Sequence, residues 1–246
     1  MIDKDWANQL ERDGHYLVRG VFDEAAAREL RDELLTAIDT ADRDGESIRS
    51  RGGSVYAARN ILQVYPPAVD AWQREPLLSV LRETLGDNFG LVRGLFFDKH
   101  PDRSWSLPWH KDMTIAVERN DLPSEQFHNP TTKAGIAHVE APRELLRQML
   151  TLRIHLDEIT EENGPLLVMP GSHNNDAASG ADQGEIHTVT SACGDVLLMR
   201  PLLSHSSGNS AEGTTRHRRI LHLEFAGQEE LPDGYRWNFF QPAGAI

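Results

Sequence analysis

The chain has 246 residues, of which 39% are hydrophobic and 26% charged, a mixture typical of a folded globular protein rather than a disordered one. Asp and Glu outnumber Lys and Arg by 38 to 25, and the resulting net charge of −13 argues against a nucleic-acid partner, whose phosphates it would repel. The single cysteine, Cys193, excludes an internal disulfide and a cysteine-ligated iron–sulfur cluster within one chain.

The chain begins with an acidic segment, Met1 to Asp5, which lacks the basic and apolar parts of a signal peptide. No apolar run approaches the ~20 residues that are needed to span a bilayer. We therefore expect a cytoplasmic protein without a membrane partner.

The first third of the chain is predicted to be mainly helical. Asp23 is a favourable N-cap, and Gly45 is expected to end the helix that it begins. The apolar residues of this helix recur every three or four positions and so share one face: Leu30, Leu34, Ile38 and Ala41. A second helix is predicted from Pro76, a good first-turn residue, to Gly86.

After residue 88 the apolar residues form short runs that are typical of strands. These runs cover residues 89–99, 149–157, 166–169, 186–190, 195–199 and 217–226. Turn sequences rich in Gly and Pro separate several of them, which favours a β sandwich or barrel over alternating β-α units. The polar segment from Glu118 to Lys133 is interpreted as a long loop, either a functional lid or a plain surface excursion.

His110 and Asp112 form a His-x-Asp sequence, a pattern that can hold a metal ion. On a strand, alternate residues share a face, so both side chains would point the same way. Two histidines and one carboxylate occupy one face of octahedral iron(II) and leave positions open for a co-substrate and O₂. The chain has 11 His and 38 acidic residues, however, so such pairs also arise by chance.

Four further pairs compete with it: His100/Asp102, His138/Glu140, His155/Asp157 and His222/Glu224. The first two lie in a proline-containing loop and at the end of an element, and are the weaker competitors. The last two lie in strand-like runs whose Leu and Ile residues alternate to the opposite face. Their polar side chains could instead face solvent or bond to each other inside a barrel. Periodicity alone leaves three pairs open.

Several segments of the chain together resemble the phytanoyl-CoA dioxygenase family, over roughly residues 10 to 226. Motifs of that family appear as Trp109-His110-Lys111-Asp112, as Glu162 to Leu166, as Pro170 to His173, and as the strand that begins at Gly194-Asp195 and leads to His205. The resemblance implies that His110, Asp112 and His205 hold iron(II). Lys111, where relatives commonly have glutamine, should point away from the metal. The presence of Asp112 implies a hydroxylase, because halogenases replace this carboxylate with a small residue.

The resemblance also implies that 2-oxoglutarate chelates the metal and that an arginine at the start of the final strand binds its far carboxylate. The candidates are Arg216, Arg218 and Arg219. Counting back from Phe225 favours Arg218, whereas counting forward from His205 favours Arg216; we prefer Arg218. Ser207, two residues after His205, matches a hydroxyl position that assists the same carboxylate, although an ordinary turn serine would look the same.

Two further groups of residues have plain interpretations beside functional ones. Trp105 and Trp109 are expected to pack a barrel wall rather than to touch substrate. A basic cluster, Arg49, Arg51 and Arg59, stands out in an acidic chain and could bind an anionic substrate, with solvated loop charges as the default interpretation.

The implied fold is mainly β, with N-terminal helices over about residues 1–88 packed on a double-stranded β-helix (jelly roll) over about residues 89–246, as a single domain over 1–246. The implied activity is hydroxylation of a small molecule with iron(II), O₂ and 2-oxoglutarate, which releases succinate and CO₂. The alternatives are a cupin-like metal enzyme that does not use 2-oxoglutarate and a non-catalytic jelly-roll binding module. The sequence indicates neither the substrate nor the oligomeric state.

Overall fold

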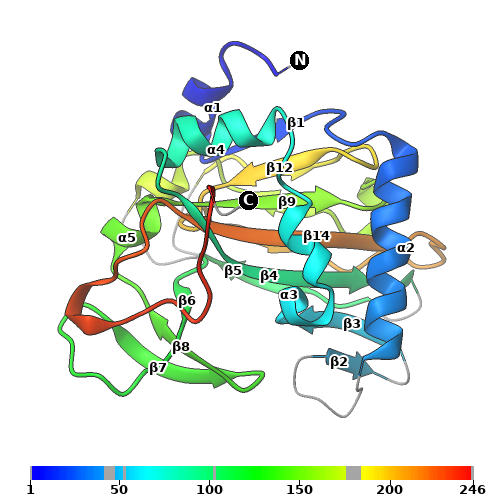
Figure 1. Cartoon of the computed structure of the whole chain (residues 1–246). Helices are drawn as coiled ribbons and strands as arrows, with labels where there is room; N and C mark the ends of the chain where they lie inside the picture. Colours follow the sequence, from blue (N-terminus) through cyan, green and yellow to red (C-terminus); the bar gives the residue numbers. More distant parts are fainter. Residues whose placement is uncertain (1, 42–47, 52–53, 102–103, 176–183, 245–246) are drawn as a thin grey trace.

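The structure is a computed structural model, and it describes residues 2–41, 48–51, 54–101, 104–175 and 184–244. Two facing β sheets form its centre, and helices cover the outer side of the larger sheet (Figure 1). Within the described residues, no helix is both long and apolar enough to cross a membrane.

The larger sheet is antiparallel and includes strands from every part of the chain. Its order is β1 (His15–Val18), β12 (Val196–Met199), β9 (Met149–His155), β14 (Arg218–Ala226), β4 (Gly90–Lys99), β3 (Ser54–Arg59) and β2 (Ile48–Arg51), and the short β15 (Gln241–Pro242) also pairs with β4. In β9 every residue is buried, because one face packs on helices and the other faces the second sheet.

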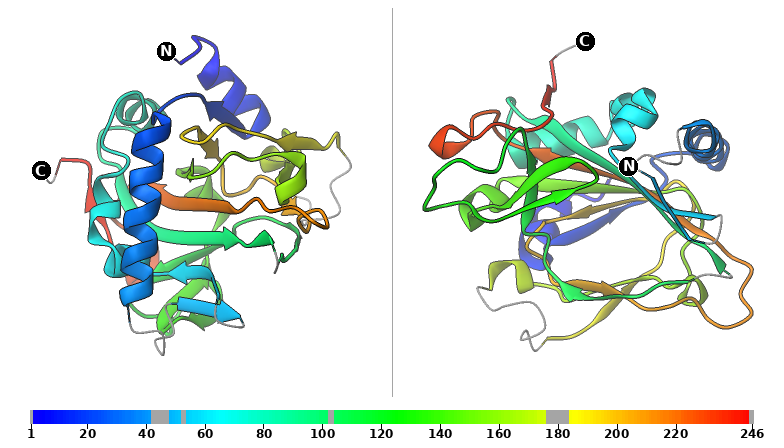
Figure 2. Two further views of the ribbon diagram at one scale, coloured as in Figure 1. Left: turned by 90° about the vertical axis from the view of Figure 1, so that its right-hand side faces the viewer. Right: turned by 90° about the horizontal axis from the view of Figure 1, so that it is seen from below.

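The second sheet has the order β11 (His187–Val189), β10 (Leu166–Val168), β13 (His205–Ser207) and β5 (Leu107–His110). From β9 to β14, every connection except that between β10 and β11 crosses from one sheet to the other. The strands β12-β9-β14-β4 and β11-β10-β13-β5 therefore form the two halves of a jelly roll, the double-stranded β-helix expected from the sequence (Figure 2).

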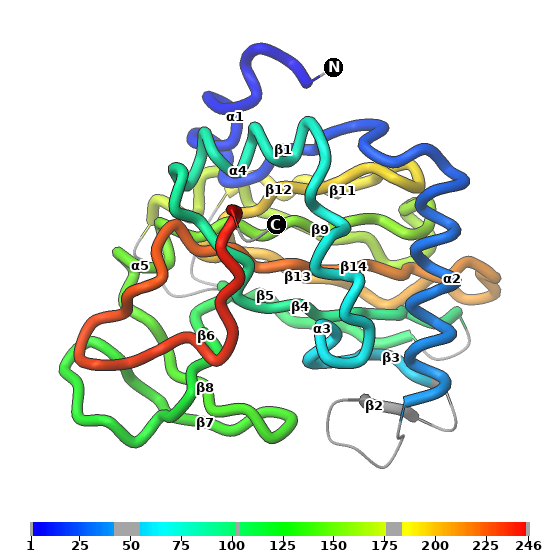
Figure 3. The backbone as a smooth tube through the Cα atoms, viewed as in Figure 1, coloured from blue at the N-terminus to red at the C-terminus, as the bar shows by residue number. Residues whose placement is uncertain are grey.

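A small third sheet lies to one side of this core. It consists of β6 (Thr114–Val117), β8 (Ile136–Glu140) and β7 (His128–Lys133). In Figures 1 and 3 these strands extend away from the main body, near the segment that leads to the C-terminus. An isolated bridge between Val117 and Trp237 joins β6 to that segment.

The helices are α1 (Trp6–Asp13), α2 (Glu24–Thr40), α3 (Ile61–Val64), α4 (Leu77–Leu85) and α5 (Arg143–Arg147), with short 3₁₀ turns at Pro66–Asp70, Glu161–Asn163, Ser172–Asn174 and Pro232–Gly234. Asp23 caps α2 as predicted, since its carboxylate accepts a hydrogen bond from the Ala26 amide at 2.8 Å. Leu34 of α2 and Leu81 of α4 belong to one buried cluster with the outward-facing Leu152 of β9. This cluster fixes the larger sheet beneath the helices.

Three details differ from the sequence-based expectations. The first third is not only helical, because β1, β2 and β3 join the larger sheet. The segment expected as a loop up to Lys133 contains β7, whose exposed polar residues show no apolar alternation. The α2 helix ends at Thr40, and Gly45 lies outside the described residues.

Candidate metal centre

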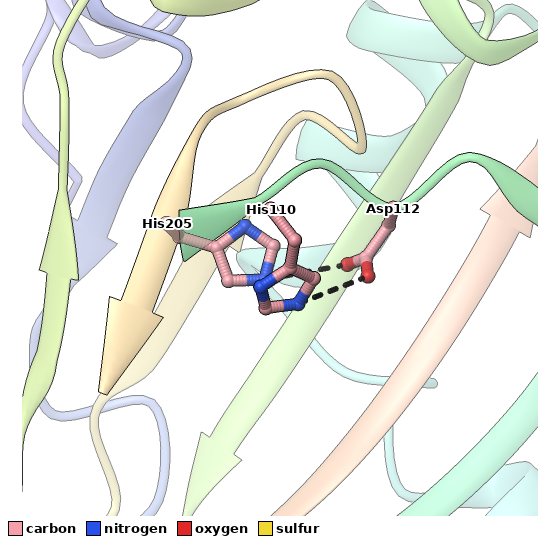
Figure 4. Close-up of side chains that lie close together, drawn as sticks. All are labelled: His110, Asp112 and His205. Atoms are coloured by element: carbon pink, nitrogen blue, oxygen red, sulfur yellow. Dashed lines mark ion pairs between the residues drawn. The ribbon is translucent and has the colours of Figure 1, made fainter. Parts of the chain in front are cut away.

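Two neighbouring strands of the second sheet bring His110 and His205 together. His110 is the last residue of β5, His205 is the first of β13, and the two are paired across the strands. Asp112 lies two residues after the end of β5, and its backbone N–H donates to the Pro201 carbonyl at 2.8 Å. Because Lys111 intervenes, His110 and Asp112 project to the same side, and Figure 4 shows all three side chains converging.

The distances within this triad suit a shared ion better than direct hydrogen bonds. Nε2 of His110 lies 3.8 Å from Asp112 Oδ1, and Nε2 of His205 lies 3.7 Å from Asp112 Oδ2. Both separations exceed hydrogen-bond length, whereas ligand atoms about 2 Å from one metal ion lie roughly 3–4 Å apart. Within the described parts of the chain, this is the one group of three such residues whose ligand atoms all lie within 4.8 Å of one another.

Backbone contacts orient both imidazoles for metal binding. His110 Nδ1 lies 2.8 Å from the Pro108 carbonyl, and His205 Nδ1 lies 2.9 Å from the Leu203 carbonyl. A carbonyl only accepts, so in each ring Nδ1 carries the hydrogen and Nε2 keeps its lone pair toward Asp112. This tautomer is the one that a metal-binding histidine requires, so the donor set fits a divalent iron.

The protonation states fit the same role. Burial lowers the pKa of His205 to about 4, so the ring is neutral near pH 7. Burial alone would raise the pKa of Asp112, but electrostatic interactions with His205, His222, His110 and Arg153 outweigh burial, and the pKa is lowered. The side chains of His110 and Asp112 remain about one-third exposed, at 31% and 35%, so the centre is open on one side.

Lys111 points away from the triad, as its position between the ligands predicts. Its Nζ donates to the carbonyls of Ser172 at 2.9 Å and Asn175 at 3.0 Å. Although it is a lysine, only 8% of its surface is exposed. It therefore anchors the strand that carries the ligands to the Ser172–Asn174 turn.

In the competing pair His155/Asp157, the two side chains contact different partners and do not form a shared metal site. His155 is buried against the Ser191 hydroxyl. Asp157 instead accepts from Arg219 Nε at 2.7 Å and lies 3.6 Å from Arg31 of α2. Asp157 is therefore part of an ion-pair group at the α2 side of the sheet.

The second competitor, His222/Glu224, forms an internal pair. His222 Nε2 lies 3.3 Å from Glu224 Oε1, and Arg93 Nη1 lies 3.3 Å from the same oxygen. This is the alternative in which the two residues bond to each other inside the barrel. Of the weaker competitors, His138 Nδ1 bonds to the Ile136 carbonyl at 2.9 Å, and Asp102 lies outside the described residues.

Arg218 begins β14 on the inner face of the larger sheet. It is 2% exposed, no acidic side chain forms an ion pair with it within the described residues, and its Nε has no hydrogen-bond acceptor. Burial lowers its pKa to about 9, and the nearby charge of Arg153 adds to this effect. A buried guanidinium that lacks an acidic partner is well suited to bind an anion.

Two residues that we did not assign to this site lie beside Arg218: Lys99, and Trp105, which we expected only to pack a barrel wall. Lys99 is its cross-strand partner on β4, is fully buried, and has its Nζ 3.2 Å from the Ser207 Oγ. The Trp105 ring lies over both cations, 4.8 Å from Lys99 Nζ and 5.7 Å from the Arg218 guanidinium carbon. Trp105 therefore covers this cationic group.

Arg216 occupies a different environment. It precedes β14, its side chain is 48% exposed, and Nη1 lies 2.5 Å from Glu158 while Nε lies 3.8 Å from Glu162. Its charge is already balanced on the surface.

The alternation of β9 could have revealed one further residue, Arg153. In this strand Thr151, Arg153 and His155 occupy every second position and share the inner face, between apolar residues that face the helices. Polar residues at every second position of an otherwise apolar strand indicate that this face of the strand lines a polar site inside the protein.

The structure describes only part of the predicted basic cluster. The side chains of Arg49 and Arg51 lie outside the described part, and Arg59 is half-buried on β3.

The chain resembles known proteins both in sequence and in fold. A probable alpha-ketoglutarate-dependent hypophosphite dioxygenase from Stutzerimonas stutzeri is 26% identical over 192 residues, which cover 69% of this chain and 56% of that protein. An ectoine dioxygenase from Bordetella bronchiseptica is 23% identical over 175 residues, 70% of this chain and 50% of that protein. The chain thus spans about half the length of the curated relatives that it matches.

The crystal structure of EctD from S. alaskensis with 2-oxoglutarate and 5-hydroxyectoine superposes with a TM-score of 0.69 at 20% identity. It covers 92% of this chain and 76% of that chain, so the two share the fold. The sequence model of the phytanoyl-CoA dioxygenase family matches residues 10–218, which include β5, the Glu161–Asn163 turn and β13. This match spans most of the chain and includes the three converging side chains, and the chain therefore belongs to the phytanoyl-CoA dioxygenase family.

Proposed function

We propose that this chain is an iron(II)- and 2-oxoglutarate-dependent dioxygenase that hydroxylates a small molecule. The observation that carries the proposal is the convergence of His110, Asp112 and His205, with both imidazoles in the metal-binding tautomer. The buried Arg218, which has no acidic partner among the described residues, supports the use of a dicarboxylate co-substrate.

The three residues would hold iron from one side. His110 and His205 would bind through Nε2 and Asp112 through its carboxylate, and three ligands leave positions free for a chelating co-substrate and O₂. Iron(II), 2-oxoglutarate and O₂ together supply the oxidising chemistry, and the co-substrate leaves as succinate and CO₂. The open side of the centre, where His110 and Asp112 are exposed, gives a substrate access.

Arg218 and its neighbours would bind the far carboxylate of 2-oxoglutarate. Ser207 projects beside it from β13, and Lys99 fixes the position of the Ser207 hydroxyl. Burial and the charges of Arg218 and Arg153 lower the pKa of Lys99 to about 6, so a bound dianion would favour its charged form. Trp105 covers this end and keeps water from the ion pair.

The two named relatives act on different compounds, hypophosphite and ectoine, so the comparison supports a small-molecule substrate without fixing its identity. We also propose that residues 1–246 act as one domain, because β1 to β3 of the first third extend the same sheet as β14. A single cysteine, part-buried and unpaired, fits a reducing cytoplasm.

Anaerobic addition of Fe(II) and then 2-oxoglutarate to the purified chain tests the proposal. We expect one Fe(II) per chain, a visible metal-to-ligand charge-transfer band with 2-oxoglutarate, and slow succinate release once O₂ is admitted. Iron binding without the band and without succinate would instead favour the cupin-like alternative. A chain that binds no iron would support the non-catalytic binding module.

A further inference from the structure

A second buried arginine, Arg153, lies on the inner face of the larger sheet. It is paired with Leu197 of β12 and with His222 of β14, and 7% of its surface is exposed. Arg218 begins β14 four residues before His222, which is roughly 13 Å along a strand. Along the strands, the backbone of Arg153 is therefore well separated from that of the proposed co-substrate anchor, although the two charges still influence each other.

Arg153 has a hydrogen-bond partner but no balancing charge. Its Nη1 lies 3.4 Å from His222 Nδ1, and His222 Nε2 lies 3.3 Å from Glu224. Because a guanidinium can only donate, Nδ1 of His222 must accept, so this ring is neutral and its hydrogen is on Nε2. The charge of Glu224 is already shared with Arg93.

No acidic side chain within the described residues forms an ion pair with Arg153, and its Nε lacks any hydrogen-bond acceptor. Burying an uncompensated charge is unfavourable, and burial lowers the pKa of this arginine to about 10. Such a group persists in a fold most readily where a ligand provides the missing charge.

The position of Arg153 relates it to the metal centre. Arg153 and His222 share the inner face of the larger sheet, and this face is opposite the second sheet, whose strands β5 and β13 carry His110 and His205. The charges of Arg153 and Asp112 also shift each other's pKa, downward for Asp112 and upward for Arg153. Burial, then the charges of Arg93 and Arg59, lower the pKa of Lys133 on β7, while Asp112 raises it. Arg153 of β9 and Lys133 of β7 thus interact electrostatically with Asp112, and Arg59 of β3 and Arg93 of β4 interact with Lys133.

This local excess of positive charge contrasts with the chain as a whole, whose net charge is −13. Near the metal, Asp112 would be occupied by the ion and Glu224 by Arg93 and His222. An incoming anion would therefore meet the charge of Arg153, with which no acidic side chain of the described residues forms an ion pair.

We propose that the primary substrate is a small anion whose oxyanion group, a carboxylate or a phosphorus oxyanion, binds to Arg153 beside the metal. The inference rests on the proposed function and adds the substrate class to it. Arg153 holds the anionic group, and His222, fixed by Glu224 and Arg93, orients the guanidinium. The metal-chelating carboxylate of 2-oxoglutarate has the same chemistry as such a group, so the test must separate the two sources.

The test uses protein loaded with Mn(II) and N-oxalylglycine, an inert analogue that fills the co-substrate site. Calorimetric titrations with methylphosphonate and propionate then probe the remaining anion site, and propionamide serves as the neutral comparison. The variant is Arg153→Gln, and the matched control is Arg216→Gln, which removes an exposed arginine that Glu158 already balances. We expect both anions to bind the loaded protein and propionamide not to bind.

In Arg153→Gln the anions should bind at least tenfold more weakly, while N-oxalylglycine binding changes by less than threefold; Arg216→Gln should match the unaltered chain. If N-oxalylglycine itself fails to bind the unaltered protein with Mn(II), the proposed function fails first. If it binds, equal anion affinity with and without Arg153 overturns the inference.

An equally large loss of N-oxalylglycine binding in Arg153→Gln also overturns the inference, because it assigns Arg153 to the co-substrate. Arg153→Lys covers the case in which the glutamine variant does not fold. Lysine keeps the positive charge but cannot donate the two parallel hydrogen bonds of a planar guanidinium, so this variant should weaken anion binding several-fold. Unchanged anion binding in this variant would contradict the proposal.

Discussion

Arg216 and Arg218 are two residues apart, but their surroundings give them different roles. Arg218 is buried at the start of β14 beside Lys99 and has no acidic partner in the described structure, whereas Arg216 is half-exposed and pairs with Glu158. Exposed ion pairs contribute little to stability or binding, because water and salt screen them. A buried guanidinium, in contrast, binds an anion in a medium that screens poorly.

Arg218→Ala should therefore weaken 2-oxoglutarate binding strongly while Fe(II) still binds. The loss would leave a carboxylate buried without its partner, a cost of about 3–5 kcal/mol, or at least about a hundredfold in Kd. Titration of the charge-transfer band in the Fe(II)-loaded variant measures the effect. Arg216→Ala is the control and should change Kd by less than about threefold. If Arg216→Ala weakened 2-oxoglutarate binding more than Arg218→Ala, the residue that binds the far carboxylate would be Arg216.

At the scale of elements, β9 shows how one strand supports both the core and the site. Its residues Leu152 and Ile154 pack against the helices, while Thr151, Arg153 and His155 face the second sheet. His155 is bonded to the Ser191 hydroxyl, and burial together with the charges of Arg153 and Arg218 lowers its pKa to about 3. The ring is therefore neutral in the folded protein across the physiological range.

This pKa makes stability depend on pH. In the unfolded chain His155 takes up a proton near pH 6.5, whereas in the folded chain it does so only near pH 3. Between these values the unfolded state binds more protons, so His155 lowers stability as pH falls, by at most about 1.4 kcal/mol per pH unit. Urea unfolding between pH 7 and pH 4.5 should show a shallower decline for His155→Gln, with the exposed His128→Gln as control. Identical slopes in all three proteins would contradict this assignment.

Sequence patterns identified the elements that obey a simple period. The α2 helix was recognisable from the Asp23 cap and its apolar stripe, and β4, β9, β12 and β14 from their apolar runs. The β7 strand was missed because its side chains are exposed and polar, so its pairing with β8 rather than its own pattern defines it. The β2 and β3 strands are short and Arg-containing, and their sequences gave no clear strand pattern.

The site was predictable only in part. Alternation predicted that His110 and Asp112 share one face, but it could not choose between them and the pairs His155/Asp157 and His222/Glu224, which have the same spacing in strand-like runs. Lys99 was missed because it is the last residue of a predicted strand, where a lysine is usually exposed. It is buried because its Nζ donates to the carbonyls of Gly164 and Gly208, which are far from it in the sequence. Such contacts depend on tertiary structure that no local pattern contains.

At the scale of the whole molecule, the jelly-roll topology assembles the centre. β5 and β13 are far apart in the sequence, and their pairing places His205 opposite His110. No spacing rule predicts that pairing, so His205 could be proposed only from the resemblance to a family. The same topology encloses cations from β4, β9 and β14 between two sheets of an acidic protein.

The central claim is that His110, Asp112 and His205 hold iron(II), and the iron content of Asp112→Ala tests it most directly. The change removes the carboxylate ligand, and two histidines alone hold the metal poorly, so anaerobic loading and dialysis in chloride-free buffer should leave almost no iron. Asp157→Ala and Glu224→Ala remove the carboxylates of the competing pairs and should retain about one iron per chain. Iron retained in Asp112→Ala but lost from either of the other two variants would contradict the assignment.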